Sequence, residues 1–189
     1  MSARVLLGLV LALFAPGVFF NPGPRDLSQP PRCQLLLSQT SRGGATFVEP
    51  SRQGLVCNPQ SNGRESAQVI RVVDGDTIVI AGNRRVRYIG IQAPEMGARP
   101  QFYGPEATQA NRRLLEGKIV TLEKDVSETD RFGRLLRYVY VDGIQVNAEL
   151  VREGYARAAA YPPDTRYQEC LELLAQEARQ SARGIWARR

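Results

Sequence analysis

Residues 68–141 alternate between short runs rich in apolar and β-branched residues and tight turns that contain glycine. The runs predicted to form strands are Gln68–Val73, Thr77–Ile80, Arg84–Ile91, Lys118–Lys124 and Leu135–Val141. Glycine turns follow the first, the second and the last of these runs. The pattern therefore indicates about five short strands joined by close connections.

Helical patterns interrupt and follow these strands. Three helices are predicted, over residues 105–115, 148–153 and 164–181, and Asn147 is expected to cap the second. The third is amphipathic, and its apolar face contains Tyr167, Leu171, Leu174 and Ala178. Five strands with about three helices, most of them late in the chain, predict a small β-barrel of the α+β class.

The N-terminal part of the chain has a different composition. Arg4 precedes an apolar run, Val5–Phe20, which is shorter than the roughly 20 residues of a spanning helix. Residues 1–20 are therefore predicted to be a signal peptide or a membrane anchor, and both remain open because Pro16 lies in the small-residue segment that a signal peptidase would read. We expect an exported protein, either secreted, periplasmic or tethered to the membrane through residues 5–20.

A segment rich in Pro, Gly and Ser, residues 21–66, follows and is predicted to be an extension to a domain over residues 67–189. It contains Cys33 and Cys57, each in a short apolar segment. In an oxidising compartment these two could close a small disulfide loop, and the alternative is two unpaired thiols. Cys170 falls in the third predicted helix, where a buried, unreactive thiol is expected.

Charge narrows the class of function. The chain carries 25 basic and 19 acidic residues, a net charge of +6 that favours polyanionic partners. Residues 1–66 hold 6 basic and 3 acidic residues and residues 67–189 hold 19 and 16, so each part contributes +3. The predicted domain is only mildly basic, which suits a focused phosphate site. The sequence has no histidine, so a Ser-His-Asp triad and His-ligated zinc are excluded.

Four short charged motifs run through the predicted domain. They are Asp74–Thr77 (DGDT), Arg87–Glu95 (RYIGIQAPE), Tyr103–Ala107 (YGPEA) and Asp130–Arg134 (DRFGR). In this order and at these separations they resemble the staphylococcal nuclease (thermonuclease-like) family of calcium-dependent phosphodiesterases. The resemblance covers residues from about 68 to 187 and implies a five-stranded OB-type barrel with about three helices.

The resemblance also implies catalytic roles. Phosphodiester hydrolysis needs an in-line nucleophile and neutralisation of charge on the phosphoryl oxygens. Arg87 and Arg134 match the two arginines that bind the phosphate, and Glu95 matches the carboxylate that orients or deprotonates the attacking water. Arginine suits this role because it stays protonated and presents a planar fork to two oxygens.

A calcium site is implied as well, with Asp76, Gln92 and Ala93 as ligands. Asp76 is the matched carboxylate, and Ala93 would supply its backbone carbonyl. The family usually has aspartate at the position of Gln92, so a neutral amide replaces one negative charge and calcium affinity should fall. Phe132 replaces a tyrosine whose hydroxyl reaches a terminal phosphate in the family, which would favour internal cuts.

The leading hypothesis is a calcium-dependent endonuclease acting on single-stranded DNA and RNA, for which the resemblance implies 3′-phosphate products. We expect a monomer, and the sequence implies no protein partner. Two alternatives remain open. One is a catalytically weak nucleic-acid-binding module on the same barrel, which Gln92 alone favours. The other is a sequence-independent single-strand binder, which would need stacking aromatics spread over the barrel face.

Overall fold

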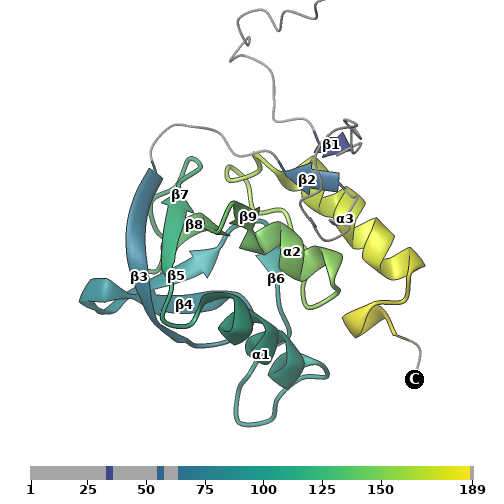
Figure 1. Ribbon diagram of the computed structural model, residues 1–189, viewed down its shortest axis with the longest axis horizontal. Helices are drawn as coiled ribbons and strands as arrows, with labels where there is room; N and C mark the ends of the chain where they lie inside the picture. The colour runs from purple at the N-terminus through teal and green to yellow at the C-terminus, as the bar shows by residue number, and fades with distance from the viewer. Residues whose placement is uncertain (1–32, 36–54, 58–63, 188–189) are drawn as a thin grey trace, which may run out of the picture.

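The computed structural model describes residues 33–35, 55–57 and 64–187, and these residues form a closed five-stranded barrel with three α-helices (Figure 1). The predicted α+β class and the barrel are confirmed. The predicted signal or anchor segment, residues 1–20, lies outside the described residues. None of the helices in the described part is long and apolar enough to cross a membrane.

Five strands close the barrel: β3 (Arg64–Val72), β4 (Thr77–Ile80), β5 (Arg84–Tyr88), β7 (Ile119–Glu123) and β8 (Leu135–Val141). They pair antiparallel in the order β5-β4-β3-β7-β8, and a parallel pairing of β5 with β8 completes the ring. The short 3-10 turn η1 (Ala81–Asn83) joins β4 to β5, and β9 (Ile144–Gln145) pairs with β8. Closure leaves these five strands without a free edge between them.

Buried apolar side chains from every barrel strand meet in one core. They include Val69, Ile78, Ile80, Val86, Tyr88, Val120, Leu122 and Val139. Their burial follows from the alternation of apolar and polar residues along the strands, because successive side chains of a strand point to opposite faces. The barrel therefore supplies a rigid support for the loops at its ends.

A turn at Ile89–Gly90 divides the run predicted as one strand over residues 84–91. Gly90 has a φ of +77°, which favours glycine, and a Cβ there would also lie 2.5 Å from Cδ1 of Leu171 and force that side chain to shift. After the turn, β6 (Ile91–Gln92) pairs with β10 (Arg157–Ala158). The chain therefore leaves the barrel sheet after β5 and continues as β6 in a separate two-stranded sheet.

Helices α1 (Gly104–Leu115) and α2 (Val146–Arg152) pack against the barrel, and α3 (Gln168–Gln180) packs on the outer side of α2 (Figure 1). Helix α1 contacts β3, whereas α2 contacts β8 and α3. The predicted apolar face of the last helix is confirmed, because its four residues are buried. A final 3-10 turn, η2 (Gly184–Trp186), follows α3.

Two predicted helix starts are wrong. Asn147 lies inside α2 and does not cap it: its Nδ2 donates to the Ile89 carbonyl at 2.8 Å and its Oδ1 accepts from Val139 N at 2.9 Å. Helix α3 begins at Gln168, because the Asp164 carboxylate instead accepts hydrogen bonds from the backbone of Val126 and Ser127. In both cases a distant backbone group takes the polar side chain that the sequence assigns to a cap.

The predicted pairing of the cysteines is also wrong. Cys57 forms a disulfide with Cys170, with the Cα atoms 5.9 Å apart, so Cys170 is not a free thiol. Strands β1 (Cys33–Leu35) and β2 (Leu55–Cys57) do pair, with Cys33 opposite Cys57. However, β2 also contacts α3, and the buried face of that helix supplies the bonding partner.

Candidate active site

A tight turn between β3 and β4 holds Asp76 at one end of the barrel. Asp76 N donates to Oδ1 of Asp74 at 3.0 Å, and Tyr88 N donates to the Asp76 carbonyl at 3.0 Å. A Cβ on Gly75 would lie 2.6 Å from the Cβ of Ala93, so only glycine lets the turn approach Ala93 this closely. The turn and the segment after β6 are therefore packed together.

The carboxylate of Asp76 is buried, with the residue 4% exposed, and all its contacts in the described structure come from donors. Ala93 N donates to Oδ2 at 2.7 Å, and Thr77 Oγ1 donates to Oδ1 at 3.2 Å. The guanidinium of Arg87 forms an ion pair with the same Oδ1. These contacts compensate the cost of burying a charge.

Arg87 lies on β5, opposite Thr77 of β4, and links the carboxylate to Gln92. Its Nη2 donates to Oε1 of Gln92 at 2.7 Å and to the Ile91 carbonyl at 3.3 Å. Burial lowers the pKa of the Arg87 guanidinium, and the neighbouring cation of Arg134 lowers it further. Arginine nevertheless stays protonated in proteins, so the site keeps its positive charge.

Glu95 is exposed, and Gln92 connects it to the buried part of the site. Gln92 Nε2 donates to Oε1 of Glu95 at 3.0 Å and to the Ala93 carbonyl at 3.2 Å. On the other side, the hydroxyl of Tyr161 donates to Oε1 of Gln92 at 3.4 Å. The amide of Gln92 therefore lies between the arginine and the carboxylate to which catalytic roles are assigned.

Arg134 reaches the same region from the loop before β8. Its Nε donates to Oδ2 of Asp130 at 2.7 Å, while Oδ1 of Asp130 accepts from the backbone N–H groups of Phe132 and Arg134. Burial alone would raise the pKa of Asp130, but these hydrogen bonds lower it on balance. Because Leu136 pairs with Arg87 between β8 and β5, the loop is held beside Arg87.

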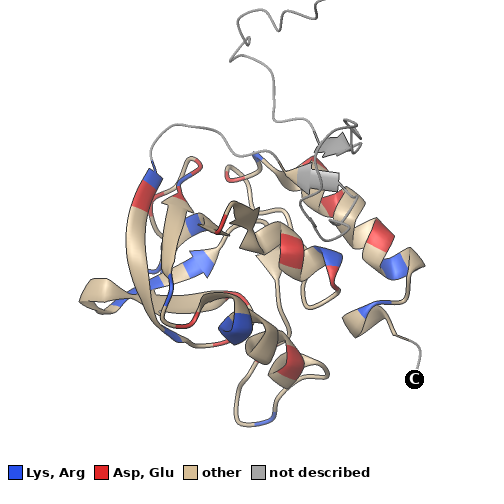
Figure 2. Cartoon of the chain, in the orientation of Figure 1, with Lys and Arg blue, Asp and Glu red and all other residues tan. Residues whose placement is uncertain are grey.

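A cleft of about 510 Å³ opens between these groups. Arg87, Gln92 and Arg134 line it together with the exposed rings of Phe132 and Tyr161. Acidic and basic residues are interspersed over the rest of the fold (Figure 2). Positive charge on the two arginines, with aromatic rings beside it, is suited to a phosphate that carries unpaired bases.

The three residues predicted to bind a metal are neighbours, because Ala93 N donates to Asp76 and Gln92 Nε2 donates to the Ala93 carbonyl. Asp76, Gln92 and the Ala93 carbonyl offer only oxygen atoms, which is the donor type a hard cation prefers. In the described residues no group of three or more His, Cys, Asp or Glu side chains could hold a metal ion. These oxygen ligands are of the type that calcium prefers, but Asp76 supplies the only negative charge among them. In this structure the guanidinium of Arg87 forms an ion pair with Oδ1 of Asp76.

Two polar residues that the sequence analysis did not single out support the site. Asn111 of α1 is buried, donates to the Asp74 carbonyl at 2.9 Å and accepts from the Tyr88 hydroxyl at 2.9 Å. It holds the turn before β4 against the barrel. Gln101 binds Glu95 through two hydrogen bonds: its Oε1 accepts from Glu95 N at 3.1 Å, and its N donates to the Glu95 carbonyl at 3.0 Å.

Gln101→Met should test this support, because methionine keeps the length of the side chain but cannot accept from Glu95 N as an amide oxygen does. A hydrogen bond contributes about 1 kcal/mol net, so we expect turnover to fall about fivefold with a smaller change in KM. Steady-state kinetics would measure both values. Gln68→Met, on an exposed position of β3, is the matched control, and equal effects of both variants would contradict the assignment.

The barrel and this group of arginines and carboxylates are suited to a hydrolase of phosphodiester bonds. A family model described as "Staphylococcal nuclease homologue" matches residues 85–188. The chain is 39% identical over 135 residues to the Thermonuclease of Staphylococcus hyicus, which is 67% of this chain and 79% of that protein. It is also 39% identical over 126 residues to Endonuclease YncB of Bacillus subtilis, 62% of this chain and 60% of that protein.

The chain therefore belongs to the staphylococcal nuclease homologue family, and it is a nuclease. The resemblance inferred from the four motifs is confirmed. A second thermonuclease, from Staphylococcus intermedius, is 39% identical over 131 residues, which is 66% of this chain and 77% of that protein. These similarities to named nucleases disfavour the two alternatives in which the barrel only binds nucleic acid.

Proposed function

We propose that the protein is an exported, calcium-dependent endonuclease that cuts single-stranded DNA and RNA. The observation that carries the proposal is the convergence of two arginines and one exposed carboxylate around Gln92 at one end of the barrel. In this proposal Arg87 and Arg134 bind the scissile phosphate, and Glu95 accepts a proton from the attacking water. The protein acts as a monomer and needs no protein partner.

The charges of these groups support their roles. A guanidinium offers paired N–H donors to the phosphoryl oxygens, and its fixed charge stabilises the negative charge that builds up in the transition state. Solvent reaches the exposed Glu95 carboxylate, and the hydrogen bond from Gln92 holds it beside the cleft. The residues can therefore bind a phosphate and orient a water molecule.

Asp76, Gln92 and the Ala93 carbonyl would hold the calcium ion. When bound, calcium would polarise the phosphate and neutralise developing charge. A cation at Asp76 competes with the guanidinium of Arg87 for Oδ1, so its binding would leave Arg87 available to a phosphate.

Two features support the choice of substrate and compartment. Phe132 and Tyr161 line the cleft with 68% and 55% of their surface exposed, and rings of this kind stack on unpaired bases whatever their sequence. The Cys57–Cys170 disulfide is typical of exported proteins, since reducing compartments keep most thiols free. It therefore agrees with the export predicted from residues 1–20.

The direct experiment is to incubate the purified protein with single-stranded DNA and with single-stranded RNA, each with calcium or with a chelator. Cleavage of both polymers with calcium, and none with the chelator, is the expected result. Full activity in the chelator would contradict the calcium requirement, and cleavage of duplex DNA at the same rate would contradict the preference for single strands.

Gln92→Asp should restore the missing negative charge beside Asp76. Calcium affinity depends on how many carboxylates face the ion, and we expect a wild-type affinity on the order of millimolar, as in extracellular calcium modules. The variant should lower the calcium concentration for half-maximal activity by about tenfold. Turnover at saturating calcium should change less, because Arg87, Arg134 and Glu95 remain.

A calcium titration of both proteins, followed by activity and by heat of binding, measures this shift. Gln68→Asp adds the same charge at an exposed position of β3 and should leave the midpoint unchanged. If Gln92→Asp also left the midpoint unchanged, Gln92 would not face the metal and the proposed ligand set would be wrong.

A further inference from the structure

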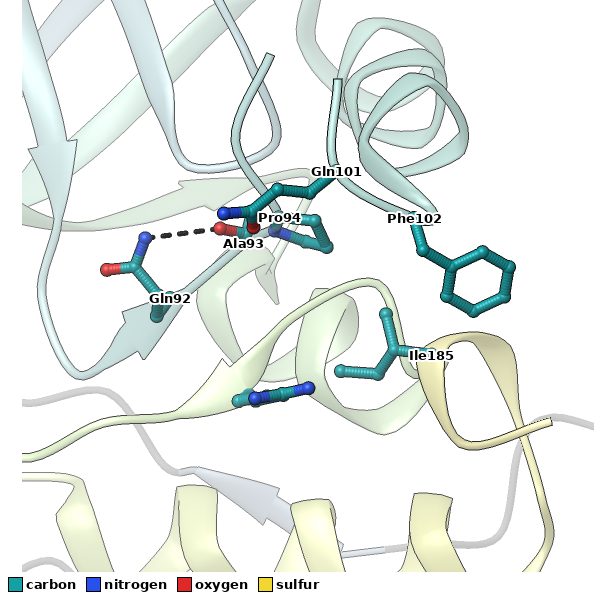
Figure 3. Close-up of a pocket in the computed structure, with 7 residues that line it drawn as sticks. Gln92, Ala93, Pro94, Gln101, Phe102 and Ile185 are labelled. Carbon is teal, nitrogen blue, oxygen red and sulfur yellow. Dashed lines mark hydrogen bonds between the residues drawn. The ribbon is translucent and has the colours of Figure 1, made fainter. Parts of the chain in front are cut away.

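A second, smaller pocket of about 200 Å³ lies beside the candidate active site (Figure 3). Gln92, Ala93, Pro94 and Gln101 line it on the side of the site, and Phe102, Arg157 and Ile185 complete it. Gln92 also lines the larger cleft that contains the two arginines. The cleft and the pocket therefore flank the same residue.

The pocket combines the three kinds of group that bind a nucleotide. Phe102 is 49% exposed and offers a ring on which a base can stack. Arg157 is exposed and offers a cation to a phosphate. Gln101 brings an amide, and apolar atoms of Pro94 and Ile185 form part of the wall.

The fold fixes the place of Arg157. It lies on β10 directly opposite Gln92 of β6, so strand pairing holds it next to the candidate site. Its guanidinium carbon lies 5.4 Å from the centre of the Trp186 ring, a cation–π contact that positions the guanidinium group. The cation is therefore part of an ordered framework.

A polynucleotide chain leaves a scissile phosphate in two directions. The larger cleft, with Phe132 and Tyr161, can receive the nucleotide on one side. We propose that the smaller pocket binds the nucleotide on the other side of the scissile phosphate, with its base against Phe102 and a backbone phosphate on Arg157. This inference rests on the proposed function, because it assumes that cleavage takes place between the two arginines and Glu95.

A volume of about 200 Å³ is below the range of pockets that enclose drug-sized ligands, which begins at about 300 Å³. The pocket therefore suits a single base or sugar–phosphate unit of a chain that continues into solvent. Such a subsite would make the enzyme sensitive to the presence of a base on both sides of the bond it cuts.

The test uses a thymidine-only single strand with one abasic residue at its centre, labelled at one end and digested with calcium to a low extent. The product ladder gives the relative kcat/KM at every linkage in one reaction. In the wild-type protein, cleavage should be depressed on both sides of the abasic residue. The expected depression is about tenfold, the size associated with loss of one stacked base.

Phe102→Ala should remove the depression on one side only, and Tyr161→Ala, in the larger cleft, should remove it on the other. Ile70→Ala, at an exposed position of β3, is the control and should leave the ladder unchanged. The proposal would be wrong if both variants lost the depression of cleavage on the same side of the abasic residue. It would also be wrong if Phe102→Ala gave the same product ladder as the wild type. Neither result would affect the assignment of the protein as a nuclease. A wild-type protein that cuts neither DNA nor RNA would contradict the proposed function and, with it, this subsite.

Arg157→Gln gives a second, independent measurement. Removing one phosphate contact should raise KM severalfold with little change in kcat, and should reduce the dependence of log(1/KM) on log salt concentration by about 0.7, the value for one contact on a single strand. Arg71→Gln, at an exposed position of β3, is the matched control. An unchanged salt dependence in Arg157→Gln would contradict the phosphate contact.

Discussion

Replacing Arg134 or Arg87 with alanine is expected to lower turnover by roughly 10²-fold or more, because each variant removes a charged donor directed at the phosphoryl oxygens. Arg84→Ala is the matched control. Arg84 lies on the same strand as Arg87, but its guanidinium pairs with Glu65 at the surface. Its removal should change turnover little.

The two arginine variants should differ in stability, which separates a catalytic effect from a structural one. The Arg87 side chain is 12% exposed and neutralises the buried Asp76, so its removal leaves a carboxylate without its cation. Breaking a buried pair in this way costs about 3–5 kcal/mol of unfolding free energy. Arg134 and Asp130 are more exposed, at 28% and 17%, so solvent screens this half-buried pair more strongly and its loss should cost less.

Denaturant unfolding and steady-state kinetics on the same preparations would measure both effects. Arg134→Ala should therefore be nearly as stable as the wild type and still lose about 10²-fold in turnover. If substitutions at Arg84, Arg87 and Arg134 all produced equal and mild losses of activity, the assignment of the site would be wrong.

The sequence predicts the barrel because local signals determine most of it. Strands alternate in polarity, and glycine marks the turns at residues 74–75, 81–83 and 142–143. The candidate site residues are predicted by motif, and in the structure Arg87 contacts both Gln92 and Asp76 directly. Short motifs can contain these three residues because they lie in two short segments on adjoining elements.

The contacts that the sequence does not predict join residues that are far apart along the chain. Asn147 resembles a helix cap locally, yet its side chain binds the backbone of residue 89, 58 positions away. Asn111 meets the Asp74 carbonyl across 37 positions, and Tyr161 meets Gln92 across 69. Arg157 stands beside Gln92 only because β10 pairs with β6. No periodicity or short motif contains such pairings, so a single sequence gives no signal for them.

The cysteines follow the same rule. Proximity in sequence favours a bond between Cys33 and Cys57, which the fold also places opposite each other in paired strands. The bond forms instead between Cys57 and Cys170, which are 113 positions apart, because α3 packs on β2. Strand β2 is therefore joined covalently to α3.

Removing this bond in a Cys57→Ser, Cys170→Ser protein is expected to lower the free energy of unfolding by about 2–4 kcal/mol. In the chain-entropy model the loss comes from the unfolded state, since a bond that closes a loop of about 100 residues removes many of its conformations. The thermal midpoint should fall by on the order of 10 °C for a domain of this size. Below that temperature activity should persist, because barrel strands and their loops hold Arg87, Arg134 and Glu95.

Cys33→Ser is the control that separates the two possible pairings. It leaves the Cys57–Cys170 bond in place, so its thermal unfolding should match that of the wild type, and non-reducing mass spectrometry should still find the peptide of Cys57 linked to that of Cys170. A Cys33–Cys57 peptide in the wild-type protein, or equal destabilisation by Cys33→Ser, would contradict the pairing. In the chain-entropy model the stabilisation grows only with the logarithm of loop length, so the two pairings would give similar losses in the double variant. The comparison with Cys33→Ser and the linked peptides therefore report which cysteines are joined.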